Sequence, residues 1–143
     1  MEEHRGGVIR IGALELRFLV DGTQGSGSVV MFEFSVPPEA RVPAPHFHER
    51  VDEVIYALEG IVTTTLDGRR HELRAGESLF IPRGSVHTHE NLHAETARSL
   101  IVMTPGTIGR RYFEEVAQEV NVAGKPDLAK IKEIMLRHGL VPA

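Results

Sequence analysis

The chain has 143 residues, of which 41% are hydrophobic and 25% are charged, with a formal net charge of -4 at pH 7. This length and composition are typical of one globular domain. The negative net charge argues against a broad surface for nucleic acid or anionic membrane. The absence of cysteine excludes disulfides, thiolate metal sites and a cysteine nucleophile. No apolar stretch approaches the ~18 residues of a membrane span, and the N-terminus lacks the apolar run of a secretory signal. We therefore expect a cytoplasmic protein.

Residues 8–104 are predicted to form β-strands. Apolar residues mostly alternate with polar ones between Leu14 and Val20, which predicts a strand with one buried face. Residues 25–36 and 51–58 are rich in β-branched and aromatic side chains and predict two further strands.

Shorter strands are predicted at residues 61–66, 69–73, 79–81 and 97–103. The pair Asp67-Gly68 separates the first two of these, and this dipeptide favours a type I′ hairpin turn. Short strands at such regular spacing predict an all-β sandwich or barrel.

The last part of the chain changes to a helical period. Apolar residues recur at helical spacing at Tyr112, Phe113, Val116 and Val120, and again at Leu128, Ile131, Ile134 and Met135. We expect the second helix to begin near Pro126-Asp127 and to end at Gly139. The predicted organisation is a β-barrel over residues 1–106, with a helical extension over residues 107–143 that packs on the barrel or on a partner subunit.

Four side chains at fixed spacing predict a metal site: His46, His48, Glu53 and His87. Three imidazoles and a carboxylate form a plausible ligand set for a divalent transition metal. His46 and His48 are two residues apart, so on a strand they share a face. Glu53 breaks this parity, and a bend around residues 49–52 would return it to the same side.

The remaining histidines are weaker candidates. His89 lies two residues beyond His87 and should face the same way, as a fifth ligand, a pocket-lining group, an acid or base behind the ligands, or an ordinary barrel histidine. We do not expect His4, His71, His93 or His138 to be ligands.

Several other side chains have ordinary structural interpretations. Tyr56 should point away from the metal and pack in the wall, and Arg98 should form an outward salt bridge rather than bind a substrate. The aromatic residues expected more often in the core than in contact with substrate are Phe32, Phe34, Phe47 and Phe80.

Two runs carry a resemblance to a known family. HFHERVDEVIYALEG (His46 to Gly60) resembles the first motif of the cupin superfamily in its H-x-H-x4-E-x6-G part. GESLFIPRGSVHTHEN (Gly76 to Asn91) resembles the second, G-x5-P-x-G-x2-H-x3-N, at every defined position. The chain departs from the family at Ala40, where a turn glycine is frequent.

The resemblance implies an all-β fold, an antiparallel jelly-roll barrel with a short helical C-terminal tail. It also implies His46, His48, Glu53 and His87 as metal ligands, and a homodimer. Small single-domain cupins are often compared with quercetin dioxygenases, yet the superfamily contains very diverse functions, so the fold does not name the reaction.

The leading functional hypothesis is a dioxygenase-like oxidoreductase that acts on a small chelating molecule in the barrel cavity. The alternatives are a metal-dependent isomerase or decarboxylase and a non-catalytic small-molecule binder. Fe, Mn, Ni, Co and Zn all suit the ligand set. Glu53 and His89 are the candidate catalytic residues, and no nucleic-acid or membrane partner is expected.

Overall fold

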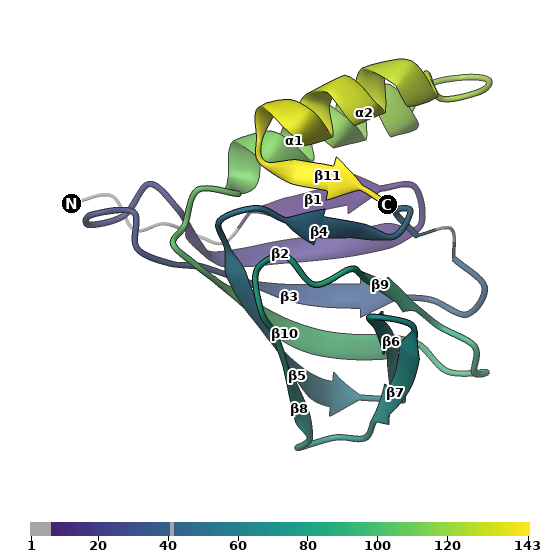
Figure 1. Cartoon of the computed structure of the whole chain (residues 1–143). Helices are drawn as coiled ribbons and strands as arrows, with labels where there is room; N and C mark the ends of the chain where they lie inside the picture. Colours follow the sequence, from purple (N-terminus) through teal and green to yellow (C-terminus); the bar gives the residue numbers. More distant parts are fainter. Residues whose placement is uncertain (1–6, 41) are drawn as a thin grey trace.

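The computed structural model describes residues 7–40 and 42–143 (Figure 1). Its strands are β1 (Val8–Ile11), β2 (Leu14–Asp21), β3 (Val30–Val36), β4 (His46–His48), β5 (Asp52–Glu59), β6 (Val62–Leu66), β7 (Arg69–Leu73), β8 (Ser78–Ile81), β9 (His87–Glu90), β10 (Ala97–Thr104) and β11 (Leu140–Pro142). Its helices are α1 (Arg110–Val120) and α2 (Leu128–Arg137).

The strands form two antiparallel sheets, as expected for a jelly-roll. One sheet has the order β1-β2-β3-β10-β5-β8 and the other has the order β11-β4-β9-β6-β7. Buried and more exposed residues alternate along β3 and β10, so each strand turns one row of side chains into the core. Phe18, Phe32 and Ile101 belong to this core and are nearly inaccessible to solvent.

The predicted hairpin between β6 and β7 is present. Asp67 and Gly68 both have positive φ angles, 48° and 82°, as a type I′ turn requires. The Asp67 carboxylate also accepts a hydrogen bond from the backbone N–H of Val86 at 2.9 Å. This bond ties the hairpin to the segment that leads into β9.

The C-terminal part covers one side of the barrel (Figure 1). Helix α1 packs against β1 and α2. The Asp127 side chain caps α2 by accepting from the N–H groups of Ala129 and Lys130, and Gly139 follows the helix with φ of 83°. These helix limits agree with the predicted ones.

Strand β11 was not predicted. It pairs with β4 and places Leu140 opposite His48 and Pro142 opposite His46. Three residues that end in proline carry no strand signal, so only the packing of α2 beside the barrel brings them to this edge.

The five aromatic residues with predicted positions differ in their burial. Phe32 and Phe34 are buried as predicted, while Phe47 is half-buried. The prediction for Phe80 is wrong, because its side chain is 56% exposed on the outer side of β8 while the neighbouring Ile81 is buried. Tyr56 lies across from Ser78 on β8, faces outward and is 41% exposed.

Arg98 forms the expected salt bridges. Its guanidinium donates to the carboxylates of Glu33 and Glu59 on the neighbouring strands β3 and β5. His4 lies outside the described residues. None of the helices in the described part of the chain is long and apolar enough to cross a bilayer.

Candidate metal centre

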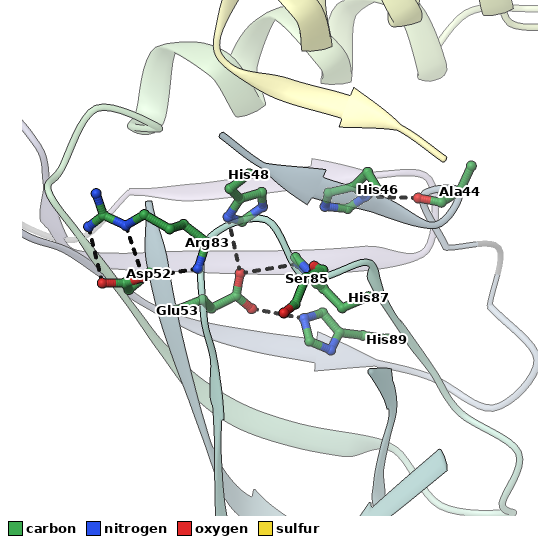
Figure 2. A network of polar contacts seen from close by, with 9 residues as sticks. All are labelled: Ala44, His46, His48, Asp52, Glu53, Arg83, Ser85, His87 and His89. Carbon is green, nitrogen blue, oxygen red and sulfur yellow. Dashed lines mark hydrogen bonds and ion pairs between the residues drawn. The ribbon is translucent and has the colours of Figure 1, made fainter. Parts of the chain in front are cut away.

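The two sheets bring the four predicted ligands to one place (Figure 2). His46 and His48 lie on β4, and His87 begins β9 directly opposite His46. A bend at residues 49–50 separates β4 from β5, which begins at Asp52 and carries Glu53. The expected return of Glu53 to the side of the histidines is therefore present.

The turn at residues 82–85 joins these strands. The backbone N–H of Gly84 donates to the carbonyl of His48 at 2.8 Å. The Asp52 carboxylate accepts from the backbone and the guanidinium of Arg83 at 3.0 to 3.1 Å. The start of β5 and the approach to β9 are thus held together, which fixes Glu53 relative to His87.

The potential ligand atoms are close to one another. Nitrogen atoms of His46, His48 and His87 lie within 4.8 Å of each other. Oε1 of Glu53 lies 3.8 Å from Nδ1 of His48 and 3.6 Å from Nε2 of His87. Ligands on opposite sides of one transition metal ion are ~4 Å apart, so small side-chain movements suffice to ligate a common ion.

The hydrogen bonds of two imidazoles define their tautomers. Nδ1 of His46 lies 2.8 Å from the carbonyl oxygen of Ala44, and Nδ1 of His87 lies 3.0 Å from that of Ser85. A carbonyl oxygen only accepts, so both Nδ1 atoms carry the hydrogen, and the neutral form of each ring keeps its lone pair on Nε2. This arrangement is typical of histidines that bind a metal.

His48 offers an independent test of whether these residues suit an ion. Its Nδ1 atom is buried, faces Glu53 and has no hydrogen-bond partner. A buried polar atom without a partner costs about 1–3 kcal/mol. A cation between His48 and Glu53 would satisfy this nitrogen, so the residues present fit a metal ion.

The protonation states of His46, His48 and Glu53 also suit a cation. Burial lowers the pKa of His46 and of His48 to about 4, so both rings are neutral at pH 7. Burial alone would raise the pKa of Glu53, but its contacts with His87 and His89 outweigh this and hold the pKa well below its usual range. For His87, burial opposes protonation, yet the Glu53 carboxylate raises the pKa overall.

His89 faces the same interior as His87, as expected. Its Nε2 lies 2.9 Å from Oε2 of Glu53 and its Nδ1 lies 2.9 Å from Oγ1 of Thr64. The other described histidines belong to neither group of potential ligands. His93 instead pairs with Glu72, and His138 pairs with Glu115.

An apolar cavity of about 80 Å³ extends from this polar cluster. Its polar end is formed by the four predicted ligands, His89 and Thr88. Its walls are apolar and are formed by Ile11, Leu14, Leu16, Phe32, Phe34, Pro43, Ile101, Met103, Ile108, Tyr112, Phe113, Val116 and Leu140.

The cavity residues after position 107 were missed as site residues. Ile108, Tyr112, Phe113, Val116 and Leu140 come from the C-terminal part and close the cavity. The apolar spacing of Tyr112, Phe113 and Val116 predicted a helix face, but a helix face does not show which surface it covers. Tyr112 is almost fully buried there, and burial raises the pKa of its phenol, which therefore stays neutral.

Known proteins share this fold and sequence pattern. A family model described as "Cupin domain" matches residues 32–103. A protein named "Polyketide synthase CurC" from Streptomyces cyaneus is 32% identical over 101 residues, which is 71% of this chain and 61% of the relative. The structure of the polyketide cyclase RemF from Streptomyces resistomycificus superimposes with a TM-score of 0.59, at 34% identity, and the match covers 74% of this chain and 79% of that one.

Another curated relative has a different activity in its name. The quercetin 2,3-dioxygenase of Bacillus subtilis strain 168 is 34% identical over 61 residues, which is 43% of this chain and 18% of the dioxygenase. The chain thus spans less than two thirds of the length of both curated relatives. The similarity to the polyketide proteins extends over more of the chain than the similarity to the dioxygenase.

Proposed function

The chain belongs to the cupin family, and on that basis we propose that it is a metal-dependent enzyme acting on a small, oxygen-bearing organic molecule in its apolar cavity. The observation that carries this proposal is the convergence of His46, His48, Glu53 and His87 at the polar end of an otherwise apolar cavity. Concave apolar sites with a few convergent polar groups are typical of small-molecule binding.

The four ligands would hold Fe, Mn, Ni, Co or Zn. When bound, such an ion supplies Lewis acidity and open coordination positions for oxygen atoms of the substrate. The side chains perform the remaining tasks. The rings of Phe32 and Phe34 give the substrate an apolar contact surface and exclude water, and a water-poor site strengthens electrostatic interactions.

The size of the cavity limits what enters it. A volume of about 80 Å³ is below the ~300 Å³ at which ligand pockets for drug-sized molecules begin. We therefore propose that only the oxygen-bearing end of the substrate reaches the polar cluster. The rest of the molecule would lie toward two lining residues at this end, Pro43, which is exposed, and Thr88, which is half-buried.

For the reaction, we favour ring closure of a polyketide-type substrate without net oxidation. The support is the polyketide cyclase, which is 34% identical over 74% of this chain. Carbonyl oxygens of such a substrate would bind the ion, and the apolar walls would contact the carbon atoms next to these oxygens. This preference departs from the dioxygenase hypothesis that the sequence motifs favoured.

Oxygenation is the second candidate. A six-coordinate ion with four protein ligands keeps two positions open, enough for a chelating substrate or for substrate and dioxygen together. The similarity to the quercetin dioxygenase supports this alternative over 43% of the chain. Dioxygen would then be the co-reactant, with both of its atoms entering the product.

Metal binding is tested first. Metal-free protein is titrated with each of the five divalent ions in competition with a chromogenic chelator, and bound metal is measured by elemental analysis. We expect one ion per chain for the wild-type protein and loss of at least 100-fold in affinity for the double variant His46→Ala/His87→Ala. The matched control is His71→Ala, because His71 lies outside both potential ligand groups. Wild-type protein without stoichiometric metal would refute the proposed site.

The reaction is tested next with the metal-loaded protein. Linear β-polyketones and flavonols are incubated with and without dioxygen, and products are identified by mass. Ring closure predicts loss of water or no mass change, equally with and without dioxygen. Oxygenation predicts a gain of two oxygen atoms and dioxygen uptake. No product from either substrate class would contradict the enzymatic proposal and leave a binding protein as the better interpretation.

The homodimer stays a prediction. Val54, Tyr56 and Phe80 expose apolar side chains on the outer side of strands β5 and β8, which supports self-association through this face. Light scattering over a concentration series tests it, and a mass of 15.8 kDa at every concentration would contradict it.

A further inference from the structure

We propose that His89 is a positioning residue of the metal centre, which together with Thr64 holds the Glu53 carboxylate so that only Oε1 faces the ligand histidines. This inference rests on the proposed metal site and adds to it two residues that are not ligands. The observation behind it is that the two oxygens of Glu53 have different partners (Figure 2).

His89 holds the Glu53 carboxylate through one of its two oxygens. Oε2 lies 2.9 Å from Nε2 of His89, a hydrogen-bond distance. Oε1 lies 3.6 Å from His87 and 3.8 Å from His48, beyond hydrogen-bond distance and on the side of the proposed ion. A carboxylate only accepts, so the hydrogen of this bond is on Nε2 of His89.

The other ring nitrogen of His89 contacts Thr64. In the tautomer with its hydrogen on Nε2, the lone pair is on Nδ1, and the Thr64 hydroxyl at 2.9 Å can donate to it. Thr64 is fully buried on β6 and lies directly across from His89 on β9. The hydrogen bonds therefore run in one direction, from Thr64 through His89 to Glu53.

The surroundings of His89 restrict its movement. Its side chain is 14% exposed, and the ring of Phe34 packs edge-on against it with centroids 6.2 Å apart. Both ring nitrogens are engaged, so rotation of the ring would break two hydrogen bonds. Because rotation is restricted, His89 keeps the Glu53 side chain on β5 at a fixed position relative to Thr64 on β6.

This arrangement has a consequence for the ion. A carboxylate with one oxygen held elsewhere offers a single oxygen to a metal, whereas a free carboxylate can offer both. A second carboxylate oxygen would take a coordination position that the substrate needs. Groups that orient metal ligands typically alter metal affinity 10- to 100-fold when they are removed.

Direct ligation by His89 is the competing interpretation, since Glu53, His87 and His89 also offer atoms within 4.8 Å of one another. The hydrogen bond from Nε2 to Glu53 and the bond at Nδ1 to Thr64 favour positioning, because both nitrogens are already used. The two interpretations differ in what a glutamine at this place should do. Glutamine can donate an N–H to Glu53 but is a poor substitute for an imidazole ligand.

The experiment compares Co(II) binding and the visible spectrum of the Co(II) protein, which reports coordination number, in the wild-type protein and four variants. We expect His89→Ala to bind Co(II) 10- to 100-fold more weakly with an altered spectrum. His89→Gln should recover most of the affinity and the wild-type spectrum. Thr64→Val, nearly isosteric, should weaken binding only a few-fold. Thr65→Val is the matched control on the same strand and should change neither quantity.

Three results would overturn the proposal. Unchanged affinity and spectrum in His89→Ala would show that His89 has no effect on the ion while leaving the metal site intact. Equal defects in His89→Gln and His89→Ala, with Thr64→Val unchanged, would identify His89 as a ligand. Failure of the wild-type protein to bind Co(II) would refute the proposed metal site and this inference with it. Circular dichroism of the metal-free variants checks folding, and Thr64→Val provides the test if a variant at position 89 does not fold.

Discussion

Acid should destabilise the metal-free protein in a pH range set by His46 and His48. Both are buried, and burial lowers the pKa of each ring from 6.5 to about 4. Between pH 6.5 and pH 4 the unfolded chain therefore binds protons at these rings that the folded chain does not. The free energy of unfolding falls as the pH falls through this range, because the unfolded state takes up more protons.

The magnitude follows from the difference between the folded and unfolded pKa. A difference of about 2.5 is worth about 3 kcal/mol for one ring, of which about 2 kcal/mol is lost between pH 6.5 and pH 5. Total stabilities of domains are about 5–15 kcal/mol, so this loss is easily measured. Glu53 adds to this loss of stability only below its ordinary pKa of 4.5, because its pKa in the folded protein is lowered. His87 has a raised pKa, so its contribution is complete below pH 6.5 and is lost only at higher pH.

Urea unfolding of chelator-treated protein at pH 7, 6.5, 6, 5 and 4.5 measures the effect. The matched variant is His46→Asn/His48→Asn, which removes the two rings and keeps the other ionisable groups. We expect the wild-type protein to lose at least about 2 kcal/mol more than the variant between pH 6.5 and pH 5. Parallel pH profiles for the two proteins would refute the reasoning, because the acid sensitivity would then come from other groups.

The remaining predictions concern stability and the C-terminal strand. Thr63→Val should leave stability unchanged or raise it by up to about 1 kcal/mol in urea unfolding, because the Thr63 hydroxyl is buried without a partner; a loss above 1 kcal/mol would contradict this. Gly60→Ala should lower the free energy of unfolding by more than about 2 kcal/mol, because Gly60 has φ of 69° and a Cβ there would lie 2.5 Å from a backbone oxygen. Gly68→Ala, with open space around it, should lower it by about 1 kcal/mol. Equal melting temperatures of the two variants would contradict this. Deletion of residues 140–143 should lower the free energy of unfolding by at least about 2 kcal/mol, because the buried Leu140 side chain is lost. It should also weaken metal binding, because β4 loses its partner strand. Unchanged affinity in the chelator competition would show that β4 is held without β11.

The motifs allowed much of the site to be anticipated. The H-x-H spacing puts His46 and His48 on one face of a strand, because side chains alternate along any strand. The bend before Glu53 could be inferred from broken parity. The direction of His89 also followed from its distance of two residues from His87. The bond from His89 to Glu53 could not be inferred, because it depends on the distance between β9 and β5.

Phe80 shows why burial was harder to predict than strand position. Alternation states that Phe80 and Ile81 lie on opposite sides of β8, but both residues are apolar and both could belong to the core. The order of the strands decides between them, and it turns Ile81 inward and Phe80 outward. A period of two separates two faces without identifying the buried one.

The sequence by itself determined the local features: the approximate positions of most strands and of the two helices, the Asp67-Gly68 turn, the cap at Asp127, and the metal-ligand pattern within the cupin motifs. Backbone angles and side-chain parity depend on neighbouring residues, so these features can be inferred from short stretches of chain. The tertiary structure alone decided that β11 pairs with β4, that α1 closes the cavity, and that Thr64 and His89 hold Glu53. The paired residues of β11 and β4 and the hydrogen-bonded residues Thr64, His89 and Glu53 are 25 or more positions apart, and packing of the whole chain, rather than any local preference, brings such residues together.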